Sequence, residues 1–274
     1  MRPFLTPKGI AGIVLVAVFA CVAIAAPFVV PAAAATRINI LERLEPPSFL
    51  HLFGTDQLGR SLLWRVMLGA HTSLVVAITA VLLSIVIGLP VGLAGGYYGR
   101  WIDQALMRLV DTLLSFPALV LALIISAVLG PSDTNTILAI GVAFSPYLAR
   151  IVRGEALRIS ALPYIEAARS QGATNTRIIV LHVLPNIMAP LIVQATLSVA
   201  FAILAEAALS FLGLGTQPPT PSWGLMIQSA RNYLDLDPWT GLIPGFAIAG
   251  TVLGLNILGD VLRDVLDPAM ALVE

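Results

Sequence analysis

The stretch EAARSQGATNTRIIVLHVLPNI, Glu166 to Ile187, is a polar segment between two long apolar runs of the chain. Just before it, Pro163 suits the first position of a helix, where the N–H that proline lacks would have no partner inside the helix. Residues 164–171 are rich in helix-forming residue types. Gly172 then suits the left-handed position that ends many helices. The pattern predicts a short helix that ends at this glycine.

A second short helix is expected after the glycine, capped by Thr174 or Asn175 and ended or kinked by Pro185. The first helix is too short to be stable alone in water, so it needs a neighbour. Ala167 and Ala168 give it a small-residue surface that a groove on another protein could approach closely. The alternative is an amphipathic helix that lies on lipid headgroups and is held there by its arginines.

The composition places this segment in a membrane protein. Of 274 residues, 58% are hydrophobic and 11% are charged, against roughly 25% charged residues in ordinary soluble domains. The 15 basic and 15 acidic residues balance, which argues against a nucleic-acid partner. Lys8 is the only lysine, so the chain has no phosphate-binding loop of the G-x-x-x-x-G-K-[ST] type. A lone cysteine, Cys21, permits neither a disulfide framework nor a cysteine-based metal site.

About 20 apolar residues cross a bilayer as a helix. Windows of that length predict an all-α membrane protein with six spans: Ile10–Val30, Ser73–Ala94, Ala105–Leu129, Thr136–Val152, Ala189–Leu212 and Leu242–Leu262. The first span is expected to be a retained anchor, although a basic start and the PAAAAT stretch at 31–36 also fit a cleaved signal peptide. The third span is the least regular, because it contains Arg108, Asp111 and Pro117.

Basic residues favour one orientation of these spans, with both termini in the cytoplasm. Ten basic residues then lie inside and five outside. Those inside are Arg2, Lys8, Arg100, Arg108, Arg150, Arg153, Arg158, Arg169, Arg177 and Arg263, and those outside are Arg37, Arg43, Arg60, Arg65 and Arg231. The polar segment of the first paragraph is cytoplasmic in this arrangement.

Spacing in the polar segment resembles a known family. Glu-Ala-Ala, three residues, Gly, eleven residues and Leu-Pro form the EAA pattern of the membrane subunits of binding-protein-dependent ABC importers. Glu166, Ala167, Ala168, Gly172, Leu184 and Pro185 match it. His182 replaces the apolar residue usual two positions before Leu-Pro, and HVLPN resembles the variant in the dipeptide, oligopeptide and nickel permease family. Four further stretches resemble the second, "C-type", subunit of that family: Phe53–Leu74, Pro90–Leu123, Glu206–Gly224 and Leu255–Pro268.

The resemblance implies a type I ABC importer transmembrane fold and a non-catalytic permease subunit in the bacterial inner membrane. Two such subunits, here a heterodimer, would form a central path for peptides or related small solutes. Each would insert a coupling helix into a separate ATP-binding subunit, and two of these would hold ATP and Mg while this chain binds no cofactor. An external solute-binding protein would deliver the cargo. The implied ATPase-coupling residues are Glu166, Ala167, Ala168, Arg169, Gly172, Leu184 and Pro185.

The same reading divides the chain into four parts. Residues 1–31 form an N-terminal transmembrane anchor and 32–72 an external segment. Residues 73–268 form the permease core, with the coupling loop at 154–188, and 269–274 form a tail.

Ionisable residues inside the spans are the candidates for the transport path. Such a residue is costly in a membrane span unless it has a function or a partner. Glu206, with Ser210 and Phe211 beside it, is expected to line the path. The alternative is a carboxylate satisfied by a neighbouring subunit or by the outer interface. Asp111 is a second candidate, although it stands three residues after Arg108 and a helix would let the two pair.

Two outer segments are predicted to carry amphipathic helices. Ser222 is the expected cap of one, with Trp223 and Met226 on its apolar face, and Thr55 or Asp56 is the expected cap of the other. Such helices would either lie in the membrane interface or cover the mouth of the path and receive the binding protein. The glycines of GLPVGLAGG, residues 88–96, are expected to allow close helix packing rather than transport chemistry.

Two other function classes are weighed against the importer. An ion-coupled secondary transporter would be expected to show related halves with ionisable residues at mid-membrane, and the sequence has no convincing half-repeat. A membrane enzyme would need an acid–base or nucleophilic set of side chains, and no span offers one.

Overall fold

The structure, a computed structural model, describes residues 6–31 and 35–266 of the chain. Predictions that concern Arg2, residues 32–34 and residues 267–274 lie outside the described residues. The chain is all-α, as predicted. Its helices are α1 (Pro7–Val29), η2 (Ile40–Glu42), α2 (Leu62–Tyr98), α3 (Arg100–Leu114), α4 (Ala118–Leu129), α5 (Asp133–Ser160), α6 (Pro163–Ser170), α7 (Asn175–Ile178), η3 (Ile179–Val183), α8 (Leu184–Phe211), α9 (Trp223–Ala230) and α10 (Trp239–Leu266).

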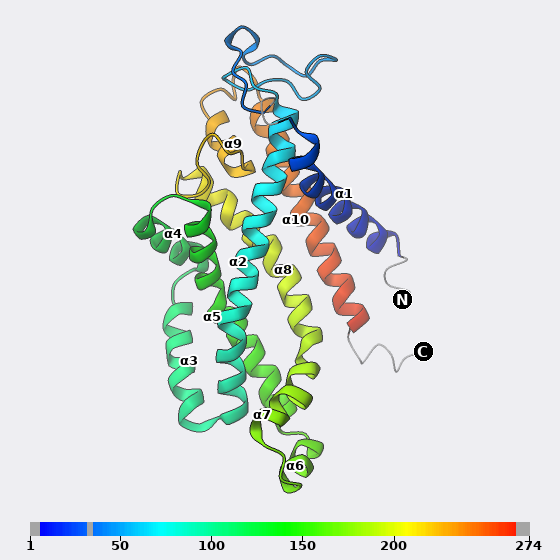
Figure 1. The fold of residues 1–274 in the computed structure, drawn as a ribbon, viewed down its shortest axis with the longest axis vertical. Helices are drawn as coiled ribbons and strands as arrows, with labels where there is room; N and C mark the ends of the chain where they lie inside the picture. The colour runs from blue at the N-terminus through cyan, green and yellow to red at the C-terminus, as the bar shows by residue number, and fades with distance from the viewer. Residues whose placement is uncertain (1–5, 32–34, 267–274) are drawn as a thin grey trace.

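The long helices run roughly along one axis of the molecule (Figure 1). Helix α2 runs down this axis, α5 runs down beside it, and α8 returns upward before α10 descends. Helices α6 and α7 lie at the lower end in this view, and the 35–61 segment lies at the upper end. We call these two ends the α6 end and the loop end.

Among the described residues, five helices are long and apolar enough to cross a membrane, or six if the bent pair α3–α4 is one span. The third predicted span, Ala105–Leu129, is bent and not straight: α3 and α4 meet at 84°. Pro117 explains the break, because proline cannot donate to the preceding turn and disfavours helical backbone at Phe116.

At least two other helix boundaries differ from the predicted spans. Helix α2 begins at Leu62, eleven residues before the predicted Ser73, so the segment expected to form a separate outer helix is the first part of α2. Asp56 and Thr55 do not cap it; Ser61 occupies that position. Helix α5 runs on to Ser160, beyond the predicted Val152. The outer helix α9 is capped as expected, since the Ser222 hydroxyl accepts from the Leu225 N–H at 3.3 Å.

Helices α2 and α5 pack backbone against backbone. Gly88, Gly92 and Gly96 recur every four residues along α2. A Cβ atom added at Gly92 would lie 2.5 Å from the Ala149 carbonyl oxygen, and one added at Gly96 would lie 2.6 Å from that of Arg153. Two helices can approach so closely only where the side chain is a hydrogen atom, as small residues allow in membranes. The prediction that these glycines serve packing is confirmed.

Helix α1 packs on α10 at a second small-residue contact. A Cβ at Gly254 of α10 would meet the Leu15 Cβ at 2.9 Å. The Lys8 ammonium pairs with the Asp260 carboxylate at 3.0 Å, which holds the start of α1 beside the end of α10. That α1 is a retained anchor stays a prediction.

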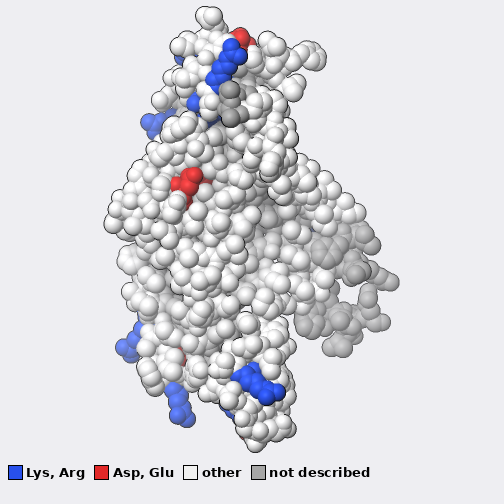
Figure 2. Space-filling model, viewed as in Figure 1, with Lys and Arg blue, Asp and Glu red and all other residues white. Residues whose placement is uncertain are grey.

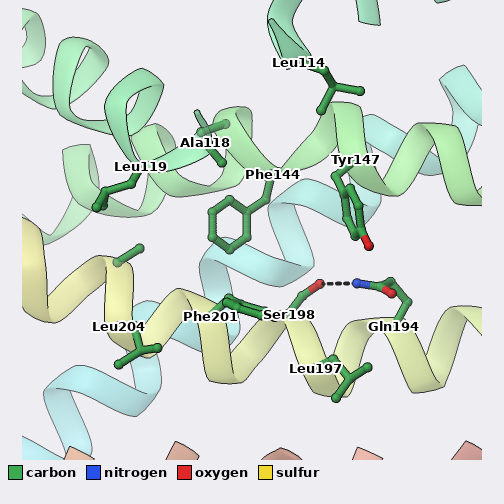
Figure 3. A pocket seen from close by; sticks show the side chains of 12 residues that line it. Leu114, Ala118, Leu119, Phe144, Tyr147, Gln194, Leu197, Ser198, Phe201 and Leu204 are labelled. Atoms are coloured by element: carbon green, nitrogen blue, oxygen red, sulfur yellow. Dashed lines mark hydrogen bonds between the residues drawn. The ribbon is translucent and has the colours of Figure 1, made fainter. Parts of the chain in front are cut away.

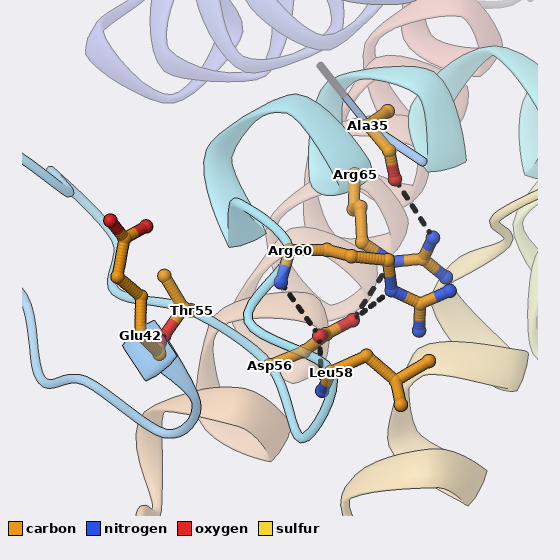
Figure 4. Close-up of polar contacts among 7 residues, drawn as sticks. All are labelled: Ala35, Glu42, Thr55, Asp56, Leu58, Arg60 and Arg65. Carbon is orange, nitrogen blue, oxygen red and sulfur yellow. Dashed lines mark hydrogen bonds and ion pairs between the residues drawn. The ribbon is translucent and has the colours of Figure 1, made fainter. Parts of the chain in front are cut away.

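At the loop end, one buried carboxylate organises the segment before α2 (Figure 4). Asp56 is 4% exposed and accepts from the backbone N–H groups of Leu58 at 2.8 Å and Arg60 at 3.0 Å. The Arg60 Nε donates to it at 2.7 Å, and the Arg65 Nε lies 3.4 Å away. Arg65 also donates to the Ala35 carbonyl at 3.2 Å. Two arginines and one carboxylate thus bind the loop to the first turn of α2.

The charged side chains are unevenly distributed along the long axis of the molecule. On the face shown in Figure 2, lysine and arginine side chains gather at the two ends, and the broad middle is mostly uncharged. An uncharged band between two charged ends is the distribution expected of helices that cross a bilayer.

Replacing Gly92 by alanine is expected to lower the stability of the protein by about 1–3 kcal/mol, because the new methyl group would overpack the α2–α5 contact. Gly154 is the matched control, since a Cβ there meets no atom within 4 Å. Gly154→Ala should raise stability by about 0.5–1 kcal/mol. The midpoint of thermal unfolding in detergent measures both, and shifts of the same sign would contradict this account of the contact.

Candidate functional site

Helix α6 forms as its sequence predicts. Pro163 occupies its first turn, and the chain leaves it at Gly172, whose φ is +82°. A Cβ at Gly172 would meet nothing within 4 Å, so the glycine is needed for its left-handed backbone and not for space. The Thr174 hydroxyl caps α7 by accepting from the Arg177 N–H at 3.3 Å.

The neighbour that stabilises α6 belongs to the same chain. Ile165 is fully buried in an apolar cluster formed by the ends of α2 and α5 and by the α7–η3 segment. Among its members are Tyr97, Val152, Ile159, Ile178 and Val183. Burying an isoleucine side chain contributes about 1.5–3 kcal/mol, which helps an eight-residue helix to persist.

The predicted coupling residues divide between two faces of this segment. Glu166 and Ala167 are exposed, whereas Ala168 is half-buried and packs against the apolar cluster. The Arg169 guanidinium lies over the Tyr97 ring, 5.1 Å from its centroid, within the range of a cation–π interaction. The surface left for a partner is therefore the side of α6 that carries Glu166 and Ala167.

Leu184 and Pro185 lie apart from that surface, at the start of α8. Leu184 packs against the apolar cluster, and Pro185 is exposed. Of the two predicted effects of Pro185, ending the second helix is wrong, because helix continues through it to Phe211; a kink at Pro185 stays a prediction. A turn of π-helix, η3, stands just before the proline, and this wider turn takes up the missing N–H that would otherwise break the helix.

Tyr97 joins the end of α2 to the α6–α7 loop. It is 7% exposed, and its hydroxyl donates to Asn175 Oδ1 at 2.9 Å. Its ring is the one that Arg169 covers. The sequence analysis did not single out Tyr97, although two tyrosines in GGYYGR at the end of an apolar span are a visible signal.

Helix α3 is bound to α5 by two ion pairs. The Arg153 Nη2 donates to Asp103 Oδ2 at 2.6 Å, and nearer the α3–α4 break Arg150 pairs with Asp111. The alternative that Asp111 pairs with Arg108 of its own helix is therefore wrong. Asp111 has a 58% exposed side chain, so as a path residue it stays a prediction.

Glu206 is fully buried on α8. The Ser210 hydroxyl donates to its Oε1 at 2.7 Å, and the hydroxyls of Ser73 and Ser222 also interact with this carboxylate. Its Oε2 accepts no hydrogen bond of good geometry from the described residues. The carboxylate thus links α8 to α2 and α9 within one chain. Glu206 and Ser210 line no open cavity here, Phe211 is 37% exposed, and all three stay predictions as path residues.

A cavity of about 470 Å³ opens between α5, α8 and the α3–α4 break. Phe144 and Tyr147 of α5 point across it toward α8 (Figure 3). On the opposite wall the Gln194 amide donates to the Ser198 hydroxyl at 3.3 Å. Aromatic rings and a few polar groups in a concave site are typical of small-molecule binding. Its remaining lining residues are Leu114, Ala118, Leu119, Ala143, Leu197, Phe201, Leu204 and Ala205.

Sequence patterns did not reveal this cavity, because its residues come from three separate spans and have no common spacing. Gln194, a polar side chain in the middle of an apolar run, was the signal that could have found it. Across residues 6–31 and 35–266, no group of three or more His, Cys, Asp or Glu side chains is placed to hold a metal ion.

Comparison with known proteins gives three results. Residues 84–272 match the family model described as binding-protein-dependent transport system inner membrane component. The chain is 46% identical over 261 residues, 95% of this chain and 86% of the other, to a dipeptide transport system permease protein of Alkalihalophilus pseudofirmus. It is 41% identical over 226 residues, 82% of this chain and 75% of the other, to a glutathione transport system permease protein of Pectobacterium atrosepticum.

The fold also resembles a solved structure, the inward-facing MetNI methionine ABC transporter. The TM-score is 0.60 at 21% sequence identity, and the match covers 75% of this chain and 98% of that chain.

Replacing Ser210 by alanine is expected to lower the stability of the protein by about 2 kcal/mol. Oε1 of Glu206 would lose its donor, and the Thr216 N–H, which donates to the Ser210 hydroxyl at 3.2 Å, would lose its acceptor. Ser170→Ala is the control, because the exposed Ser170 hydroxyl donates only to a carbonyl in its own helix. Thermal unfolding of the two variants measures the difference, and equal midpoints would refute a buried network at Glu206.

Proposed function

The chain belongs to the family of binding-protein-dependent transport system inner membrane components, and from this we propose that it helps to carry peptides, or related small solutes, into the cell. It is a permease subunit of an ABC importer. The family and the fold exclude the rival hypothesis of an ion-coupled secondary transporter.

The observation that carries the proposal is the exposed side of α6. Glu166 and Ala167 face outward on a helix that lies at one end of the molecule, while Ile165 on its other side is held by the ends of the long helices. A separate ATP-binding subunit would dock on this exposed side. Because Ile165 is anchored, α6 would stay attached to the ends of α5 and α2 when a partner displaces it.

The cavity between α5 and α8 is the proposed contact with the cargo. Its rings would pack against apolar groups of a peptide, and Gln194, Ser198 and the Tyr147 hydroxyl would bind peptide N–H and C=O groups. A second membrane subunit of different sequence would close the open side of the cavity. An external solute-binding protein would deliver the cargo at the loop end, and two ATP-binding subunits or domains, which hold ATP and Mg, would act at the α6 end.

This arrangement sets the orientation in the bacterial inner membrane. The α6 end would face the cytoplasm. The start of α1 and the end of α10 would lie on one side of the membrane, because Lys8 and Asp260 pair with each other. The larger number of arginines and the only lysine lie on the same side as the proposed ATPase.

Replacing Glu166 by lysine is expected to weaken binding of the ATP-binding subunit at least about tenfold, because a reversed charge at a complementary interface is repelled. Glu42→Lys makes the same charge change at the loop end and should leave binding intact. Co-purification from gently solubilised membranes, quantified against the unmodified complex, measures both. Equal recovery from the two variants would show that α6 is not the docking site.

A cysteine in the cavity is expected to change its accessibility when ATP is bound. The variant is Phe201→Cys in a Cys21→Ala background, and the control is Val86→Cys on α2, which is similarly exposed but lies outside the cavity. A hydrophilic maleimide should label Phe201→Cys to a different extent with and without ATP, Mg and vanadate. If Phe201→Cys stays unlabelled, like a lipid-facing position, the cavity is not part of the path.

A further inference from the structure

Tyr97 lies where three parts of the chain meet. It belongs to the last turn of α2, next to Gly96, which packs on the Arg153 carbonyl of α5. Its hydroxyl reaches Asn175 at the start of α7, and its ring carries the guanidinium of Arg169 from the end of α6. One side chain therefore contacts the loop both before and after its turn at Gly172.

The two contacts differ in kind and together fix a position. A hydrogen bond of 2.9 Å sets the distance between α2 and α7, because its strength falls steeply with poor geometry. A cation over a ring sets the position of α6 above α2, and it tolerates sliding more than separation. Tyr97 is 7% exposed, so its ring is also locked by packing and has few other rotamers available.

Two other contacts join α6 to the η3–α8 segment: the Asn186 amide donates to the Tyr164 hydroxyl at 3.4 Å, and the Tyr164 and His182 rings meet edge to face. Neither of them reaches α2. Ile165 is anchored in the apolar cluster, but apolar packing alone allows a short helix to pivot about its anchor, because the hydrophobic effect is non-directional. Tyr97 and Arg169 would supply the directional contact between α6 and α2.

We propose that Tyr97, with Arg169 and Asn175, is the positioning contact that makes α6 and α2 move as one body, so that displacement of α6 is transmitted to the spans instead of being lost as local rotation. This inference deepens the proposed function: Arg169 acts inside its own chain and is not a contact to the ATP-binding subunit. It also explains why the ring and the hydroxyl of the same residue both have partners.

The test measures the position of α6 relative to α2 in the purified complex. Spin labels are placed on cysteines at Ser170, exposed at the end of α6, and at Val86, exposed on α2, in the Cys21→Ala background. The distance distribution between the labels should be narrow, and it should stay narrow when ATP, Mg and vanadate are added. We call the fraction of molecules whose label distance lies outside the main peak the displaced population. Tyr97→Phe removes the hydroxyl and keeps the ring, so it should raise the displaced population about fivefold.

Tyr97→Leu removes both contacts and should raise that population further, to about tenfold or more. Asn175→Ala should match Tyr97→Phe, and the two together should add nothing, as expected when both remove one shared interaction. Tyr98→Phe is the matched control, because Tyr98 is the next residue, is 45% exposed, and would lose only its hydroxyl. An unchanged distribution in Tyr97→Leu would overturn the proposal.

A second measurement distinguishes this failure from a failure of the proposed function. The complex in proteoliposomes is supplied with its binding protein and radiolabelled alanyl-alanine, and uptake per ATP hydrolysed is measured. Tyr97→Phe should lower this ratio about fivefold without loss of assembly, and Tyr98→Phe should leave it unchanged. If the unmodified complex shows no ATP-driven uptake, that result would count against a peptide cargo. The spin-label distances would still decide the role of Tyr97.

Discussion

The close contact of α2 with α5 is the constraint on which the rest of the structure depends. In a bilayer, burying apolar side chains between helices gains little, because lipid is as apolar as the side chains, so association relies on tight packing. Gly88, Gly92 and Gly96 present a smooth strip of backbone to α5, where an added Cβ would come within 2.7 Å of a carbonyl oxygen at each position. Side chains larger than hydrogen would separate the helices, and the cluster at their lower ends would open.

That cluster is what allows α6 to exist as a helix. At eight residues it is far shorter than the 12–15 residues that make an isolated helix even marginal in water. The sequence predicted correctly that it needs a neighbour and located it in a foreign protein. In the structure the first neighbour is the chain itself, through Ile165, and the exposed side with Glu166 and Ala167 remains for a partner. A docking helix that is already formed does not have to be ordered when it binds, so binding loses less entropy.

Local signals in the sequence predicted local structure well. The first turn at Pro163, the left-handed Gly172 and the caps at Thr174 and Ser222 follow from rules that involve a few neighbouring residues. The break at Pro117 and the π-turn before Pro185 were harder, because each depends on how a proline is accommodated by the helix around it. Pairings between helices could not be predicted: Asp111 lies within reach of Arg108 in sequence, but α5 brings Arg150 closer. The cavity could not be predicted for the same reason, since Phe144 and Gln194 face each other only after three spans have packed.

The two walls of the cavity differ in stiffness, and this difference bears on how the molecule would act as a permease. One wall, α5, is joined along its length to α2 by glycine contacts and continues within two residues into α6. The other wall, α8, is preceded by the π-turn η3 and contains Pro190 about two turns later, both of which weaken the backbone ladder of a helix. Helix α5 also contains a proline, Pro146, but Gly88 of α2 packs against the neighbouring Ser145 carbonyl and supports α5 at that point. A force applied to α6 would therefore move α5 and α2 together, while the lower part of α8 bends. Phe144 and Tyr147 travel with the first wall and Gln194 and Ser198 with the second, so the width of the cavity is the quantity that such a force would change most directly.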